Sequence, residues 1–192
     1  MNKKFKIKVF LDIDGVLNNT SDNRKLENSI KKHKSKEFWK NKIEYFSHIK
    51  IFDNTLNRAT FDFVNRQKLK QFQRLLKNYN HEIYIISSWC NYGGIDDNEV
   101  LKYKNYFDLN IVNSTLYTGG NGELRYLSSL EKINEDDDLI LYLDDIKIPD
   151  NIDVHEKYIH PRIIRAITSK QFKYLKRIIK EKEMNYLKQN NH

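Results

Sequence analysis

The chain has a single cysteine, Cys90, among its 192 residues. One cysteine excludes a disulfide within the chain and is typical of proteins in a reducing cytoplasm. No apolar run approaches the roughly 20 residues that cross a bilayer. The N-terminal segment starts with basic residues, as a signal peptide does, but lysines interrupt its apolar stretch and two aspartates follow it. We therefore expect a cytoplasmic protein without a membrane association.

The sequence also lacks an internal repeat and a linker long enough to separate two independent domains. Its length suffices for one domain with its own core. Hydrophobic residues make up 39% and charged residues 31% of the chain, which is a globular composition. We expect residues 1–192 to form one domain.

The formal net charge is +8 at pH 7. One explanation is a biased composition, because lysine, asparagine, isoleucine and tyrosine are all abundant and an AT-rich coding sequence produces this pattern. The other explanation is attraction to nucleic acid or another polyanion. Net charge bears on association and leaves both explanations open.

Apolar runs alternate with segments of helical periodicity along most of the chain. Short apolar runs bounded by polar residues predict strands, and apolar residues three or four apart predict helices. Strands are predicted at 5–11, 82–87, within 105–113, at 139–143 and within 154–159. Helices are predicted after Asn65, after Asn121 and after Thr168. This alternation favours a parallel sheet with helices on both faces.

Finer expectations follow from the same patterns. Leu124, Leu127 and Leu130 share one side of the middle helix, which we expect to face the core. Lys6 and Lys8 fall in the first half of the first strand, which we expect nearer the surface, and 136–138 reads as a solvated turn. Residues 18–62 fit no ordinary strand and helix pair, so we expect a small insertion after the first strand.

Polar residues finish three of the predicted strands. The first strand is followed by Asp12, Asp14 and Gly15, the second ends in Ser87-Ser88-Trp89, and the fourth ends in Asp144-Asp145. In open α/β sheets, ligands bind beyond the carboxyl ends of the strands. Carboxylates that converge there would repel one another, and a bound hard cation such as Mg²⁺ relieves the repulsion.

Each pattern has an ordinary explanation when taken alone. An Asp-Asp pair is often a turn, and a Ser-Ser pair is often a helix cap. Their joint position at the ends of buried strands, in the order Asp-x-Asp, Ser, Asp-Asp, favours one chemical site.

These runs resemble the motifs of a known phosphatase superfamily. FLDIDGVLN, IYIISSW and LILYLDD are similar to the first, second and fourth motifs of haloacid dehalogenase-like (HAD) phosphatases. More narrowly, this set together with GNGELRYL and a late TSKQF helix resembles the HAD domain of Swiss-army-knife RNA-repair proteins. The resemblance spans residues 5–180 apart from the insertion. It implies a three-layer, Rossmann-like α/β fold with residues 18–62 as a small inserted cap.

The resemblance also implies roles for the residues that finish the strands. Asp12 would attack phosphorus as the nucleophile, and Asp14 would act as general acid and base. Ser87 would bind a phosphoryl oxygen, with Ser88 as its support or its substitute. Gly15 lets the chain turn tightly beside the substrate. Metal and substrate ligands are then expected as follows: Mg²⁺ on Asp12, Asp14, Asp144 and Asp145, and the substrate on Gly15, Ser88 and Trp89.

Two of these assignments have alternatives. The family's third motif supplies a lysine or arginine, but the corresponding loop reads TGGNGELRYL and Arg125 is the nearest candidate. An exposed helix arginine is the other interpretation of Arg125. Trp89 either stacks on a base or packs at the end of its strand.

The sequence therefore predicts a Mg²⁺-dependent phosphomonoester hydrolase. The resemblance and the basic charge favour a nucleotide, or an RNA or DNA end, as the phosphorylated substrate. A small phosphorylated metabolite is the alternative substrate. A different class of function, suggested by the departure at the third motif, is a weakly active nucleic-acid- or protein-binding module whose basic terminal helix is the working surface.

Overall fold

The computed structural model describes residues 4–13, 15–17, 64–87, 95–115, 121–163 and 166–190. The predicted cap at 18–62 lies outside these residues, and so do Asp14, Ser88 and Trp89. Among the described helices, none is long and apolar enough to cross a membrane.

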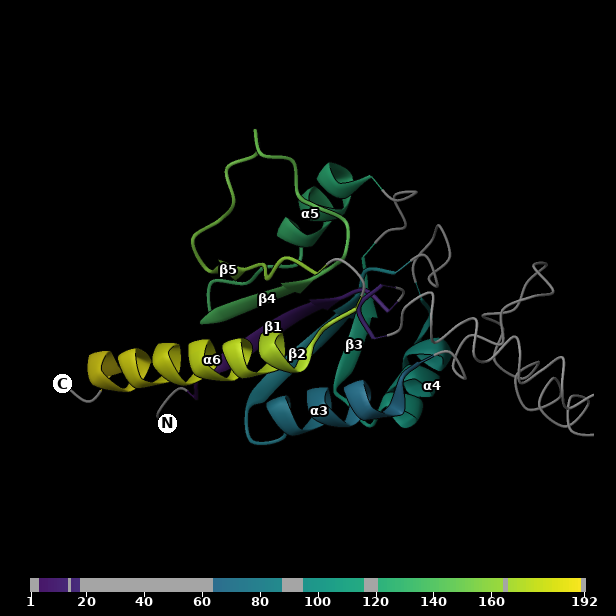
Figure 1. The fold of residues 1–192 in the computed structure, drawn as a ribbon, viewed down its shortest axis with the longest axis horizontal. Helices are drawn as coiled ribbons and strands as arrows, with labels where there is room; N and C mark the ends of the chain where they lie inside the picture. Colours follow the sequence, from purple (N-terminus) through teal and green to yellow (C-terminus); the bar gives the residue numbers. More distant parts are fainter. Residues whose placement is uncertain are drawn as a thin grey trace, which may run out of the picture.

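The described strands form one parallel sheet (Figure 1). Its strands are β1 (Lys6–Leu11), β2 (Asn80–Ile85), β3 (Ile111–Ser114), β4 (Leu139–Leu143) and β5 (Tyr158–Ile159). Their order is β3-β2-β1-β4-β5, and Val9 at the centre of β1 is paired with Ile83 and Leu141. The predicted parallel sheet is confirmed. Because β1 lies between β2 and β4, the residues that follow these three strands meet at one edge.

Helices cover both faces of the sheet, which gives three layers (Figure 1). They are α3 (Arg66–Leu76), α4 (Asp97–Phe107), α5 (Gly122–Leu130) and α6 (Ser169–Asn190). One core joins α3, α4 and α6 to the side chains of Ile7, Val9 and Leu11. A second core lies on the opposite face, where Tyr126 of α5 packs with Phe10. Side chains alternate along β1, and each set supplies one core.

The three predicted helix starts are confirmed. The Asn65 side chain accepts hydrogen bonds from two backbone N–H groups of α3, and Asn121 accepts one from Leu124 at 3.1 Å. At α6, the Thr168 N–H donates to the Gln171 side chain at 2.8 Å, and the Gln171 N–H donates to the Thr168 hydroxyl at 3.3 Å. These caps satisfy N–H groups that a helix start leaves unpaired.

Helix α4 was not predicted. The strand expected within 105–113, around Ile111 and Val112, is confirmed as Ile111–Ser114. A signal for the helix exists: Asp96 and Glu99 form a capping box in which each side chain accepts the other's backbone N–H. Its buried side includes Tyr103 and Phe107, which are weak helix formers, and packing against the sheet outweighs that preference.

The predicted orientation of α5 was wrong for two of its three leucines. Leu124 and Leu127 are 48% and 44% exposed, whereas Leu130 is half-buried against the core that contains Tyr126. Arg125, Tyr126 and Ser129 are buried. The Ser129 hydroxyl lies 2.8 Å from the hydroxyl of Tyr158, and Arg125 lies among carboxylates. Polar contacts with the sheet therefore decide which side of α5 turns inward, against the spacing of its leucines.

The predicted surface position of Lys8 was wrong as well. Its side chain is fully buried, and its Nζ lies 2.7 Å from the equally buried carboxylate of Asp137, in the segment expected to be a solvated turn. Lys8 also donates to the backbone carbonyl of Lys132. Burial is tolerable because each charge has a partner. Lys6, by contrast, is half-buried and lies 3.2 Å from Glu82.

Candidate active site

Asp12 lies directly beyond the central strand, between the ends of its two neighbours. Its backbone N–H donates to the carbonyl of Leu143 at 2.8 Å, and the Ile86 N–H donates to the carbonyl of Leu11 at 3.0 Å. Strand pairing therefore extends to the last residues before the site. Asp12, Ser87 and Asp144, which follow β1, β2 and β4, are all buried.

Arg125 enters this group from α5. It is only 4% exposed, and its Nη1 lies 3.0 Å from Asp12 Oδ2 and 3.1 and 3.2 Å from the two carboxylate oxygens of Asp144. The interpretation of Arg125 as an exposed helix residue is therefore excluded. A basic side chain stands between the two carboxylates, as the third motif requires.

The loop after β4 brings a third carboxylate to the site. Carboxylate oxygens of Asp12, Asp144 and Asp145 lie within 4.8 Å of one another. Asp12 and Asp144 are buried, whereas Asp145 is exposed. Three oxygen donors of this kind, with one side open to water, match the preference of Mg²⁺ for carboxylates and retained waters. The described residues therefore fit a magnesium ion.

Asp144 is held by its neighbours. Its Oδ1 accepts the Ile146 N–H at 2.9 Å, and its Oδ2 accepts the Tyr142 hydroxyl at 3.4 Å. Burial, together with the charge of Asp144, raises the pKa of Tyr142, so its hydroxyl stays protonated and donates. The His160 ring packs edge-on against Tyr142 and hydrogen-bonds to the backbone of Asp144. These contacts fix the orientation of one carboxylate.

The pKa values of Asp12 and Arg125 each reflect opposing effects of burial and of neighbouring charges. Burial and the charge of Asp144 raise the pKa of Asp12 to about 8, against the effects of Arg125 and of a hydrogen bond from Ser87. Burial lowers the pKa of Arg125, but the charges of Asp12 and Asp144 outweigh burial and raise it overall. Arg125 therefore remains charged, and a further cation would favour the carboxylate form of Asp12.

Two glycines allow the loops around the site to approach closely. Gly15 has a φ of +78°, which L side chains rarely adopt, and a Cβ there would overlap the Asp145 carboxylate. A Cβ on Gly122 would overlap the Lys147 carbonyl. Gly122 thus lets the start of α5, the helix that carries Arg125, lie directly against the loop that follows Asp145.

The structure brings together most of the residues that the sequence singled out. Asp12, Gly15, Ser87, Arg125, Asp144 and Asp145 surround one place beyond the sheet. Asp14, Ser88 and Trp89 lie outside the described residues, and their roles stay predictions. Sequence reasoning missed Tyr142 and the contact of His160. Alternation along β4 is a signal for Tyr142, which lies two residues before Asp144 and therefore shares its side.

The parallel three-layer fold and this group of carboxylates, serine and arginine define a protein of the HAD superfamily. At the level of that superfamily, the site is one of a HAD-type phosphatase. The sequence matches the family described as the HAD domain in Swiss Army Knife RNA repair proteins over residues 8–172, and the chain belongs to this family. No curated protein matches the chain, and no solved structure matches it.

Proposed function

We propose that the protein is a Mg²⁺-dependent phosphomonoester hydrolase that acts through an aspartyl-phosphate. The observation that carries this proposal is the buried bridge from Arg125 to Asp12 and Asp144. A guanidinium in this position neutralises the nucleophile's surroundings and faces the place where a phosphoryl group would enter.

The reaction divides into two displacements. An oxygen of the Asp12 carboxylate forms a bond to phosphorus, and the bond from phosphorus to the leaving alkoxide breaks. The departing oxygen takes a proton, which the family resemblance assigns to Asp14. Water then attacks the acyl phosphate, gives up a proton to the same group, and releases inorganic phosphate with Asp12 restored.

Donors around Asp12 support the binding of a dianionic group. Arg125 hydrogen-bonds to Asp12 and Asp144 through Nη1, and its buried Nε has no hydrogen-bond partner among the described residues. That Nε–H could serve a phosphoryl oxygen. The Ser87 hydroxyl, which hydrogen-bonds Asp12, could serve another.

A magnesium ion, when bound, would neutralise the charge that gathers on the phosphoryl oxygens. Asp12, Asp144 and Asp145 would hold it, with the main-chain carbonyl of Asp14 as the further ligand that the resemblance implies. Arg125 forms salt bridges to two of these three carboxylates, Asp12 and Asp144.

A nucleotide or the terminal phosphate of a nucleic acid is the proposed substrate. The family takes its description from RNA repair proteins. The chain's net charge of +8 suits a polyanionic substrate.

Hydrolysis of an aryl phosphate, with and without Mg²⁺, tests the chemistry. Wild-type protein should release phosphate only with the metal, and Asp12→Asn should lose at least a hundredfold in kcat because an amide is a poor nucleophile. Asp153→Asn is a matched control, since Asp153 is exposed in the loop between β4 and β5. Equal rates for wild type and Asp12→Asn would contradict the catalytic role.

The substrate class is tested by comparing mononucleotides with oligonucleotides phosphorylated at the 3′ or the 5′ end. We expect a clear preference in kcat/KM for one of them over a phosphorylated sugar. Rates that do not differ among all four would remove the nucleic-acid assignment while leaving the phosphatase chemistry in place.

A further inference from the structure

The exposed side of α3 carries positive charge alone. Residues 65–80 contain five basic and no acidic residues. Four of the five are spaced four, four and three residues apart, so they form one stripe along the helix, and all four are exposed: Arg66, Lys70, Arg74 and Lys77. We call these four side chains the α3 stripe.

Helix stability does not explain this arrangement. A cation near the start of a helix opposes the helix dipole, and α3 has no acidic residue in its first turn. Like charges four residues apart, such as Arg66 and Lys70, repel each other. Within the described part of the chain, no salt bridge involves any member of the α3 stripe. The stripe therefore lacks an anionic partner among the described residues.

The stripe leads into an open hollow of about 730 Å³ between the last turns of α3 and α4. Lys104 of α4 joins three members of the stripe in its lining, and Asp108 is the one acidic residue there. The Gln73 side chain donates to the carbonyl of Phe107 at 2.7 Å, which ties the two helices together along the hollow. Four cations against one anion give this surface a strong preference for negative charge.

His81 adds an unpaired polar atom to the lining of the hollow. Its Nδ1 lies 2.9 Å from the carbonyl of Tyr79, which can only accept, so Nδ1 carries the proton. Its Nε2 is buried without a hydrogen-bond partner among the residues described. With the proton on Nδ1, Nε2 can only accept a hydrogen bond and offers no donor to a phosphate oxygen, so the four cations of the lining are the groups that favour an anion.

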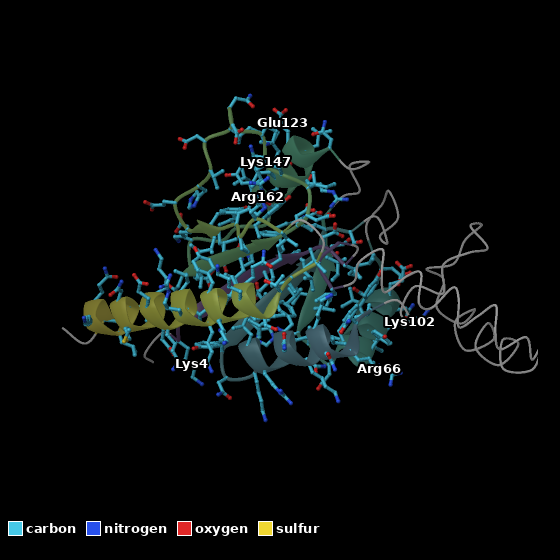
Figure 2. All side chains as sticks on the ribbon, in the orientation of Figure 1. Lys4, Arg66, Lys102, Glu123, Lys147 and Arg162 are labelled. Atoms are coloured by element: carbon cyan, nitrogen blue, oxygen red, sulfur yellow. The ribbon has the colours of Figure 1, made fainter. Side chains whose placement is uncertain are left out.

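The other end of the stripe lies beside the active site. The Asn65 N–H donates to the carbonyl of Leu17 at 3.0 Å, and the Leu17 N–H donates to that of Ile13 at 2.9 Å, one residue from Asp12. Helix α3 then runs back along the sheet from Arg66, which is labelled in Figure 2. Its 11 residues span about 16 Å, which equals about five nucleotides at the 3.4 Å spacing of a stacked strand.

From these observations we infer that the α3 stripe and the hollow bind the phosphate backbone of a single-stranded nucleic acid. A single row of cations matches one backbone, and the hollow has the volume of a small-molecule site, large enough for a nucleotide. Among the described residues, the lining contains no phenylalanine, tyrosine or tryptophan, so binding depends on phosphates rather than on bases stacked on such rings. That the strand ends at Asp12 rests on the proposed function; the binding surface itself does not.

Two charge-matched variants test this surface. One removes three cations from it: Lys70→Gln, Arg74→Gln and Lys77→Gln. The control removes three exposed cations from the basic side of α6: Lys173→Gln, Lys176→Gln and Lys180→Gln. Glutamine is a good helix former, so both helices should persist. Fluorescence anisotropy with a labelled ten-nucleotide single-stranded RNA gives the dissociation constant as salt is raised.

We expect the α3 variant to bind about tenfold more weakly at low salt, with a salt slope smaller by about 2, because three phosphate contacts are lost. The α6 control should lose less than half as much binding free energy as the α3 variant. Aryl phosphate hydrolysis should be unchanged in both, which separates this surface from the catalytic site. An inactive wild type with a selective loss of binding in the α3 variant would sink the proposed chemistry and still support the surface.

Binding that is unchanged in the α3 variant, or reduced equally in both variants, would overturn the inference, because net charge alone would then account for it. Displacement of the RNA by an equal charge of poly-glutamate would overturn the nucleic-acid assignment.

Discussion

Arg125 is the basic residue of the candidate active site. It is buried between Asp12 and Asp144, and its guanidinium contacts both. Lysine carries the same charge on a single nitrogen without the planar fork, so the two residues are not equivalent in such a position. Replacing Arg125 by glutamine and by lysine therefore separates the effect of its charge on catalysis from the effect of its shape.

We predict that Arg125→Gln lowers kcat on an aryl phosphate by about 100- to 1000-fold, the usual effect of losing one donor that stabilises transition-state charge. Arg125→Lys should recover part of that loss because it restores the charge. Steady-state kinetics measures both, and the circular dichroism of each variant checks the fold. A glutamine variant as active as wild type would show that Arg125 only pairs the carboxylates.

Tyr142 and His160 hold Asp144 in place: Tyr142 hydrogen-bonds to its carboxylate and His160 to its backbone. Neither was singled out as functional from the sequence, because a tyrosine in an apolar strand and a lone histidine usually belong to the core or the surface. Only the placement of β5 beside β4 brings His160 to the backbone of Asp144.

Among the elements, α4 and α5 are those that sequence patterns described least well. The leucines of α5 are spaced as an inward-facing stripe, but the buried side is the polar one, with Arg125 and Ser129. Helix α4 has a capping box at Asp96 and a buried side formed by aromatic residues. In α5, contacts with the sheet outweigh the spacing of the leucines. In α4, they outweigh the low helix propensity of the aromatic residues.

The cap of α4 gives a prediction at this scale. Asp96→Ala should lower the free energy of unfolding by about 1 kcal/mol, because the Glu99 N–H loses its acceptor. Asp97→Ala removes an equal charge from the first turn without removing the cap, and it should cost less than half as much. Urea unfolding measures both changes; equal losses would mean that charge, and not the cap, supports the helix.

At the scale of the whole molecule, a buried ion pair joins the centre of the sheet to a distant turn. Lys8 in β1 and Asp137, which precedes β4, lie 2.7 Å apart without exposure. Lys6 also lies 3.4 Å from Asp137, and Glu82 lies 3.8 Å from Lys8, so these four charged side chains form one network. A change to either partner should therefore affect global unfolding.

We predict that Lys8→Met destabilises the fold by about 3 kcal/mol, because it leaves the Asp137 carboxylate buried with only weaker partners. The double variant Lys8→Met/Asp137→Asn should be more stable than Lys8→Met alone, since the uncompensated charge is gone. Thermal and urea unfolding compare these two variants with wild type and with the single variant Asp137→Asn. A double variant that loses the sum of both single changes would show that the two residues do not interact.

The sequence by itself determined the parallel sheet, three helix starts and the strand ends that carry Asp12, Ser87, Asp144 and Asp145. These features are local: an apolar run followed by a polar residue, or a cap followed by a periodic stripe, is recorded in neighbouring residues. Because β1, β2 and β4 are adjacent parallel strands, the polar residues after them necessarily meet at one edge.

Only the tertiary structure decided which side of α5 turns inward, where Arg125 points and that Lys8 is buried. Each of these outcomes depends on a partner far along the chain, such as Asp144 for Arg125 and Asp137 for Lys8. A local pattern cannot show that such a partner compensates a charge, because burying a charge is favourable or costly according to what the fold places beside it.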